Sequence, residues 1–218
     1  MMLSRFGNRA SIDKQGIEYA LSFPEIKSIH TTISLNGAWF RTHYRTRGEG
    51  YDKPSVVINN EDYPYVAVYA NELSDNRVRQ QFNTNLLFVI HVPRYRLLGT
   101  IGIQNMWYTS SQYDAVSGLP VHYIDQYGNR HAFTQDMASD HFMSYMVKKF
   151  PEMYFKTSKV PIESTINLKL SKEIGEKLRL SFYVNNLYCY EPDYKSNYGV
   201  LVRRISEPYF GMEVNLKL

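Results

Sequence analysis

The stretch Tyr209-Phe210-Gly211-Met212-Glu213-Val214-Asn215-Leu216-Lys217-Leu218 decides the fold. From Phe210 onward its apolar residues occupy every second position, and Gly or polar residues fill the positions between them. A two-residue period places these two sets on opposite faces of a β-strand. A strand with one wholly apolar face suits the wall of a transmembrane β-barrel, where that face meets lipid. A soluble sheet can produce the same alternation, so the rest of the sequence has to separate the two.

Similar alternation recurs upstream of this stretch. It occupies segments 17–23, 29–45, 78–90, 97–108, 164–170 and 178–187. At about 3.3 Å per residue and a tilt of about 40°, segment 78–90 would cover about 30 Å, which is enough to span a membrane. The sequence therefore predicts an all-β fold, an antiparallel transmembrane β-barrel segment with about seven wall strands.

The connections between these segments alternate between short and long. The short ones lie around Pro24, Pro93 and Gly175, and the long ones lie around Pro54, Gly128 and Asn197. Outer-membrane barrels have this layout, with short periplasmic turns and long extracellular loops. A β-sandwich does not need such an asymmetry, so the pattern favours the barrel.

The second long loop, 110–162, contains the one predicted helix. Ser139 could cap a segment over 140–150, in which Phe142, Tyr145 and Met146 share a face, and Pro151 would end it. We expect this amphipathic helix to pack over its own loop.

The predicted number of wall strands is odd, whereas single-chain bacterial barrels have an even number. We therefore expect residues 11–218 to be the C-terminal portion of a longer barrel, and residues 1–10 to be a non-native or disordered start. Signal peptide and plug domain are not recognisable ahead of Ser11. In lipid, such a piece would expose two open sheet edges with unpaired backbone groups.

Composition excludes several classes of protein. The chain has 19 Tyr and 11 Phe, and Tyr is favoured both in strands and at membrane–water interfaces. A Tyr-rich β-sandwich would have the same composition. The net charge of +4 comes from scattered residues with no basic block, so no nucleic-acid partner is expected. No run of eighteen apolar residues is present, which excludes a spanning helix.

The sequence offers no clear catalytic, metal or cofactor site. The nearest metal-like grouping is His122, Asp125 and His131 in the second long loop, and a solvated loop explains it better. Nucleophile elbow, phosphate loop and zinc-ligand spacing are all missing. We therefore expect neither an enzyme nor a bound cofactor.

Three segments resemble one known family. Segment 166–187 resembles the penultimate hairpin of TonB-dependent outer-membrane receptors, especially their starch-utilisation-type, carboxypeptidase-regulatory-like branch. Segment 208–218 resembles their closing strand, and segment 33–41 resembles an upstream barrel strand. The residues similar to the signal read by the barrel-assembly machinery are Phe210, Gly211, Val214, Leu216 and Leu218.

The resemblance implies a location in the cell outer membrane and import of a scarce nutrient ligand, such as a glycan, peptide or metal complex. It also implies the partners: outer-membrane lipid, the barrel-assembly machinery, the remainder of the barrel and its plug, TonB acting through that plug, and a surface lipoprotein. Extracellular loops hold the ligand in such receptors. The candidate ligand-contact residues are Tyr51, Tyr63, Trp107, Tyr108, Tyr113, Tyr123 and Tyr127. For each of them, an interfacial girdle or loop packing is the alternative role.

Two other hypotheses remain open at this point. The chain could be a self-contained small β-barrel or β-sandwich that acts as a binding or adhesion module with large loops. That barrel would need an eighth wall strand, which segment 56–69 would supply. A barrel enzyme would instead show Ser, His and Asp side chains converging at one rim.

Overall fold

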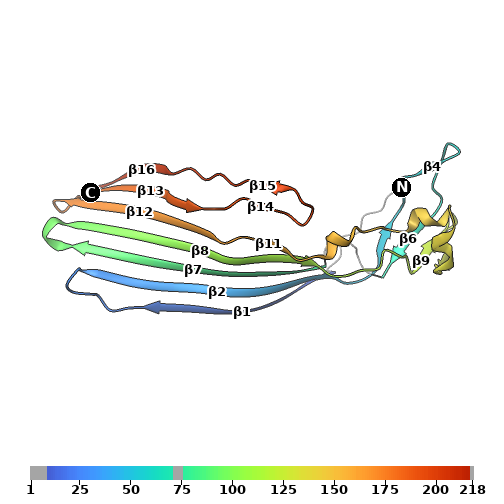
Figure 1. Cartoon of the computed structure of the whole chain (residues 1–218), viewed down its shortest axis with the longest axis horizontal. Coiled ribbons are helices and arrows are strands. Elements are labelled where there is room, and N and C mark those ends of the chain that lie inside the picture. The colour runs from blue at the N-terminus through green and yellow to red at the C-terminus, as the bar shows by residue number, and fades with distance from the viewer. Residues whose placement is uncertain (1–8, 71–75, 217–218) are drawn as a thin grey trace. The chain divides into compact units, whose positions relative to one another are not determined.

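The computed structural model describes residues 9–70 and 76–216 and consists mainly of β-strands (Figure 1). The chain forms two compact units. The sheet unit comprises Gln15–Arg41, Arg79–Ser111 and Ser158–Leu218, and the loop unit comprises Met1–Lys14, Thr42–Val78 and Gln112–Thr157. No helix in the described part of the chain is both long and apolar enough to cross a membrane.

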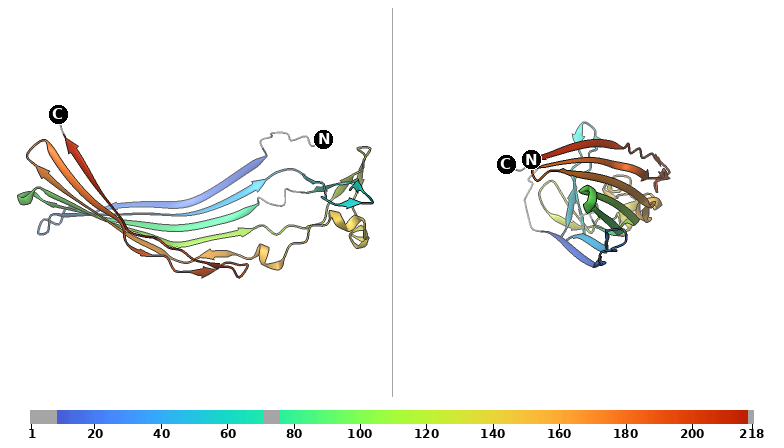
Figure 2. Two further views of the ribbon diagram at one scale, coloured as in Figure 1. Left: turned by 90° about the horizontal axis from the view of Figure 1, so that it is seen from above. Right: turned by 90° about the vertical axis from the view of Figure 1, so that its left-hand side faces the viewer.

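One sheet accounts for most of the sheet unit. Its strands are β1 (Ala10–Ser22), β2 (Thr31–Thr46), β7 (Arg77–Val92), β8 (Leu97–Tyr113), β12 (Glu163–Ile174), β13 (Leu178–Tyr190) and β16 (Tyr209–Leu216). They lie side by side in chain order, and the short β11 (Ser158–Val160) adds to β8 (Figures 1 and 2). The all-β fold with antiparallel strands is thus confirmed.

Several strands are longer than the alternation predicted. The first begins at Ala10 instead of residue 17, and β8 runs on to Tyr113. Polar residues such as Asp13 and Lys14 extend the first strand. Ladder hydrogen bonds use the backbone, so a strand can continue through residues whose side chains carry no hydrophobic pattern.

The three short connections are tied to one another by hydrogen bonds. The first bonds to the end of β7 through the His91 N–H and the His30 carbonyl, at 2.9 Å. The second contains a 3-10 turn, η1 (Pro93–Tyr95), followed by Arg96 in the left-handed region. The Arg96 guanidinium donates to the Gly175 carbonyl of the third, at 3.0 Å. All three therefore lie at one end of the sheet, the short-turn end.

The strand register separates an apolar face from a polar face. Leu168, Val184 and Phe210 lie in one row across β12, β13 and β16, and Leu170, Phe182 and Met212 lie in the next. Many of these side chains are exposed, including Phe182, Phe210 and Met212. On the opposite face, Ser171 and Ser181 share a hydrogen bond of 2.8 Å and Lys169 pairs with Glu213 at 2.8 Å. The sheet therefore leaves much of its apolar side uncovered.

Residues 47–70 and 114–157 of the two long loops fold together in the loop unit. Their strands β3 (Gly50–Asp52), β6 (Val66–Tyr69), β9 (His122–Ile124) and β10 (Arg130–Ala132) form a second sheet in the order β10-β9-β6-β3. A small hairpin, β4 (Val57–Ile58) and β5 (Glu61–Asp62), precedes β6. Tyr63, Ala67, Tyr69 and Met146 form the buried core of this unit.

The predicted helix over 140–150 is wrong. The region contains only 3-10 turns, η2 (Asp136–Ser139), η3 (Met143–Met146) and η4 (Glu152–Phe155). Ser139 does not cap the central turn, whose N-cap is Phe142; the Asp140 carboxylate, two residues before it, accepts the N–H groups of Phe142 and Met143 at 2.9 Å. The core explains the difference, since buried tyrosine hydroxyls bond the Phe142 and Met146 carbonyls. Beyond the turn, the Lys148 N–H bonds the Gly118 carbonyl instead of a helix partner.

The third long loop carries a two-stranded hairpin of its own, β14 (Tyr194–Lys195) and β15 (Leu201–Val202). Arg204 stabilises the base of this hairpin through an ion pair with Glu163 and a hydrogen bond to the Pro192 carbonyl.

Segment 56–69 contributes no strand to the main sheet, because its strands pair within the loop unit. The eighth wall strand of a self-contained barrel is therefore not found there, and in the described residues no pairing joins β1 to β16.

Candidate ligand-binding surface

The structure divides the predicted aromatic residues between the two units. Tyr51, Tyr63, Tyr113, Tyr123 and Tyr127 belong to the loop unit, whereas Trp107 and Tyr108 lie in β8 within the sheet unit. The Trp107 indole N–H donates to the Thr84 hydroxyl at 2.8 Å, so this ring is fixed to a neighbouring strand. The seven residues do not form one cluster.

Tyr63 is a core residue of the loop unit. Its side chain is 0% exposed, and its hydroxyl donates to the Phe142 carbonyl at 2.7 Å. Burial raises its pKa to about 12. Because the ring is buried and the hydroxyl is already hydrogen-bonded, Tyr63 is not available for contact with a ligand at the surface.

Packing also accounts for two other predicted tyrosines. Tyr113 stacks on Tyr154 with ring centres 4.7 Å apart. Tyr123 lies between two rings, edge-on to Tyr65 at 5.1 Å and stacked on His131 at 5.0 Å. For both residues, the alternative role of loop packing is the one the geometry favours.

Tyr51 belongs to a polar cluster on one face of the loop sheet. The register aligns Tyr51 with Val68, and Val68 with His122. Directly opposite residues of an antiparallel pair share a face, so Tyr51 and His122 lie on the same side. Arg130, two residues from the partner of His122, projects to that side too. With Glu49, these residues form what we call the Glu49 cluster: Glu49, Tyr51, His122 and Arg130.

Hydrogen bonds link every member of the Glu49 cluster. The Tyr51 hydroxyl donates to Glu49 Oε2 at 2.9 Å, and Arg130 Nη2 bonds Glu49 Oε1. The same Arg130 nitrogen donates to His122 Nδ1 at 3.3 Å. The Arg130 hydrogen bond, followed by that of Tyr51, lowers the pKa of Glu49. The bond to Glu49 in turn raises the pKa of Tyr51. The cluster therefore holds an ionised carboxylate and a neutral phenol side by side.

Tyr127 is the most accessible of the predicted residues, at 80% exposed, in the turn between β9 and β10. Asp125 shapes this turn. Its carboxylate accepts the Tyr127 and Asn129 N–H groups at 2.9 and 2.8 Å, and the His131 imidazole at 2.9 Å. The bond from His131 is the main cause that lowers the pKa of Asp125. Tyr127 is thus an exposed ring on a fixed turn.

The grouping of His122, Asp125 and His131 does not converge on one point. His122 lies opposite Ala132 and His131 lies opposite Tyr123, so the pleat directs the two imidazoles to opposite faces. Asp125 is already saturated by its turn. Within residues 9–70 and 76–216, no group of three or more His, Cys, Asp or Glu side chains is arranged to hold a metal ion.

A second imidazole–carboxylate pair joins His43 and Asp114, with Nε2 and Oδ2 2.7 Å apart. The other ring nitrogen, Nδ1, accepts the Arg45 Nε–H at 3.2 Å. In a catalytic triad a nucleophile hydroxyl would occupy the second nitrogen. The pair therefore supports packing at the strand ends and gives no geometry for a nucleophile.

Sequence reasoning missed Glu49 and Arg130. They are 81 residues apart and belong to different loops, and no motif marks either one. The alternation of Tyr51 with Glu49 was the only local signal, since residues two apart share a strand face.

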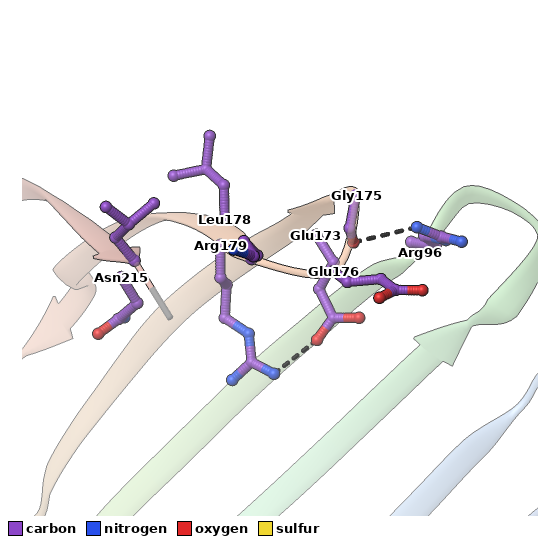
Figure 3. A pocket seen from close by; sticks show the side chains of 9 residues that line it. Arg96, Glu173, Gly175, Glu176, Leu178, Arg179 and Asn215 are labelled. Carbon is purple, nitrogen blue, oxygen red and sulfur yellow. Dashed lines mark hydrogen bonds and ion pairs between the residues drawn. The ribbon is translucent and has the colours of Figure 1, made fainter. Parts of the chain in front are cut away.

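A hollow of about 620 Å³ lies at the short-turn end of the sheet unit (Figure 3). Arg96, Glu173 and Arg179 line it, and Arg179 pairs with Glu173 at 2.5 Å. Leu216 of β16 lies at its border. Two of the lining cations, Arg96 and Arg179, are engaged by the Gly175 carbonyl and the Glu173 carboxylate, so these contacts hold the short turns together.

The predicted barrel-assembly residues follow the strand register. Phe210, Val214 and Leu216 point to the exposed apolar face, and Gly211 faces the opposite side beneath Tyr183. Leu218 lies outside the described residues.

Comparisons with family models, curated proteins and solved structures found no match.

Proposed function

We propose that the chain is the C-terminal part of the β-barrel of a TonB-dependent outer-membrane transporter that imports a scarce nutrient ligand. The observation that carries the proposal is the main sheet, whose seven strands lie side by side in chain order. Short turns join β1 to β2, β7 to β8 and β12 to β13, and long loops join the other consecutive strands. This is the connectivity of an outer-membrane barrel wall.

The uncovered apolar face supports a lipid environment. Phe182, Phe210 and Met212 adjoin one another in the register and are each exposed. A large contiguous apolar patch on a protein marks a surface that contacts a partner or a membrane. The Ser171–Ser181 and Lys169–Glu213 bonds on the opposite face suit the polar interior of a barrel.

The loop unit is the part that would meet the ligand. Tyr51 and Tyr127 are exposed, and the Glu49 cluster adds charged and hydrogen-bonding groups. Aromatic rings combined with a few fixed polar groups are typical of small-molecule and peptide recognition. A glycan, a peptide or a metal complex would be the cargo.

Lipid contact is tested with tryptophans on the two faces of one strand. The chain has two Trp, Trp39 and Trp107, and both are first replaced by Phe. In that background, Phe182→Trp and Tyr183→Trp place a single indole on adjacent residues of β13 that face opposite sides. The chain is then folded in vesicles containing lipid brominated along its acyl chains. We expect strong quenching for Phe182→Trp and weak quenching for Tyr183→Trp.

Equal quenching at both positions, or folding in plain buffer with no gain from lipid, would refute the membrane assignment.

Transport is tested separately in cells. Deleting the gene should abolish uptake of one class among glycans, peptides and metal complexes. Tyr51→Ala and Tyr127→Ala should weaken that uptake without lowering the amount of protein in the outer membrane. Normal uptake of every class in the deletion strain would refute the transport assignment.

A further inference from the structure

The surface around the Glu49 cluster has an excess of positive charge. Arg9 lies beside the cluster, and its Nη1 donates to the Glu49 main-chain carbonyl at 3.3 Å. Two guanidinium groups, those of Arg9 and Arg130, are thus close to one carboxylate, that of Glu49. In the part of the chain that the structure describes, no second carboxylate bonds any of these side chains. Even with His122 neutral, this surface therefore attracts anions.

Arg130 keeps hydrogen-bond donors that the protein does not use. Its Nη2 makes both bonds within the cluster, to Glu49 Oε1 and to His122 Nδ1. A guanidinium also carries N–H groups on Nε and Nη1, and within residues 9–70 and 76–216 neither of these atoms bonds the protein. The Arg130 side chain is 43% exposed, so a ligand can reach these donors from solvent. Carboxylate and phosphate oxygens are the acceptors that guanidinium donors bind most strongly.

An anchored aromatic ring lies beside these donors. The Tyr51 ring is more than half exposed, and Glu49 Oε2 accepts its hydroxyl at 2.9 Å. A ring held in this way loses little conformational freedom when a ligand stacks on it. His122 adds a further donor, because its Nδ1 accepts from Arg130 and the neutral imidazole then carries its proton on Nε2.

We infer that the Glu49 cluster, together with Arg9, binds a saccharide that carries a carboxylate, such as an oligosaccharide of uronic acids. The two guanidinium groups bind the ligand carboxylate, and the Tyr51 ring stacks on the apolar face of a sugar ring. Two guanidinium charges against Glu49 leave one positive charge, which suits a carboxylate better than a phosphate ester with about two negative charges. The inference rests on the proposed function, in which the loop unit meets the ligand, and it names the class of that ligand.

The position of the cluster favours a saccharide over a peptide. Sheets bind extended peptides at an open edge, where unpaired backbone groups make the contacts. Tyr51, His122 and Arg130 instead lie on one face of the loop sheet. This face offers an exposed ring, N–H donors and the Glu49 oxygens as acceptors. The C–H faces and hydroxyl groups of a sugar match such a set.

The inference is tested by isothermal titration calorimetry on the full chain folded in detergent micelles. The ligands are a tetrasaccharide of galacturonate, its methyl ester and a tetrapeptide of glutamate. The ester keeps the sugar rings without the charges, and the peptide keeps the charges without the rings. We expect the acid to bind about tenfold or more tightly than the ester, because the ester loses charged hydrogen bonds. The peptide should bind no better than the ester.

Three variants assign the binding to the cluster. Arg130→Gln should weaken binding of the acid by about tenfold or more and leave binding of the ester unchanged. Glu49→Gln should tighten binding of the acid, because it removes the carboxylate that repels the ligand and keeps an acceptor oxygen. A misfolded variant would not gain affinity. Lys148→Gln is the matched control, since Lys148 pairs with Asp52, whose side chain faces the other side of the loop sheet.

Equal affinities for the acid and its ester would overturn the inference, and so would the absence of binding to both. Binding of the glutamate peptide as tight as that of the acid would overturn the saccharide class. Equal losses in Arg130→Gln and Lys148→Gln would show an effect of net charge alone and would also overturn the inference. These outcomes leave the lipid-quenching and uptake tests untouched. Failure of those tests with selective binding of the acid intact would refute the transporter and not the saccharide site.

Discussion

Gly211 shows how single residues shape the sheet. A Cβ atom at this position would overlap the Tyr183 ring, which lies over the glycine on the polar face. Gly37 is covered in the same way by Tyr19. A ring laid over a strand glycine shields the backbone and fixes the register of adjacent strands. Tyr183 and Gly211 therefore lock β16 to β13.

The first prediction concerns this contact. Gly211→Ala should destabilise the folded chain by about 1–3 kcal/mol, because the added methyl group displaces the Tyr183 ring. Gly102→Ala is the matched control, since the nearest atom to its Cβ would be Leu87 Cδ1 at 4.0 Å. Urea unfolding in detergent micelles measures the difference. Adding Tyr183→Ala should remove most of the penalty from Gly211→Ala. A penalty that survives in the double variant would place its cause in the backbone.

The second prediction concerns the pH dependence of the loop unit. Burial raises the pKa of Tyr63 from 10.0 to about 12. The unfolded chain then loses the phenol proton more readily than the folded chain does. The stability that the protonated Tyr63 contributes is fully present below pH 10 and is lost as the pH rises toward 12. The free energy of unfolding should fall by up to about 1.4 kcal/mol per pH unit in this range because of Tyr63.

Chemical unfolding followed by near-UV circular dichroism between pH 9 and pH 12 measures this slope. Tyr63→Phe should reduce it, while lowering stability at neutral pH by about 1–3 kcal/mol because the Phe142 carbonyl loses its donor. Tyr127→Phe removes an exposed phenol and should leave the slope unchanged. Equal slopes in the Tyr63 and Tyr127 variants would contradict the assignment.

At the scale of elements, β16 has faces of different character, and this leads to the third prediction. Met212→Arg places a charge on the apolar face and should cost about 2–4 kcal/mol if the position lies near the bilayer midplane. Asn215→Arg, on the opposite face of the same strand, should cost much less. Unfolding from lipid vesicles gives both values. Similar losses for the two variants would show that the apolar face does not meet lipid.

Strands and helix differ in how far local sequence determines them. The strand rows containing Phe182 and Phe210 follow from a two-residue period, which any half-buried sheet enforces. The helix predicted over 140–150 failed because tertiary contacts decide that segment. The hydroxyls of Tyr63 and Tyr69 bond the Phe142 and Met146 carbonyls, and these donors lie more than seventy residues upstream. Local propensity carries no information about such partners.

The same reasoning explains which site residues could be predicted. Tyr51 and Tyr127 were recognised as aromatic residues in polar loops, and both are exposed. Tyr63 has the same local character but is buried, because two distant loops close over it. The link between Glu49 and Arg130 requires β3 and β10 to join the same sheet. This pairing order is not encoded in either loop alone.

For the whole molecule, the division into two units has an energetic consequence. The loop unit has its own buried core of Tyr63, Ala67, Tyr69 and Met146, whereas the sheet unit is held mainly by its ladder and by contacts between strand side chains. A unit with its own core can open as a cooperative block, separate from the rest of the chain. We therefore expect the two units to unfold in separate transitions.

Met146→Ala provides the fourth prediction and tests that independence. Met146 is 0% exposed in the loop-unit core, so truncating it should destabilise this unit by about 2–5 kcal/mol. Amide hydrogen exchange should become faster in β3, β6 and β9 and remain unchanged in β12 and β13. Met153→Ala is the matched control, because this side chain of the same unit is 46% exposed and its loss leaves little cavity. If exchange rose equally in both sheets, the core of the loop unit would be part of one cooperative structure, and folding of the loops would depend on the strands that carry them.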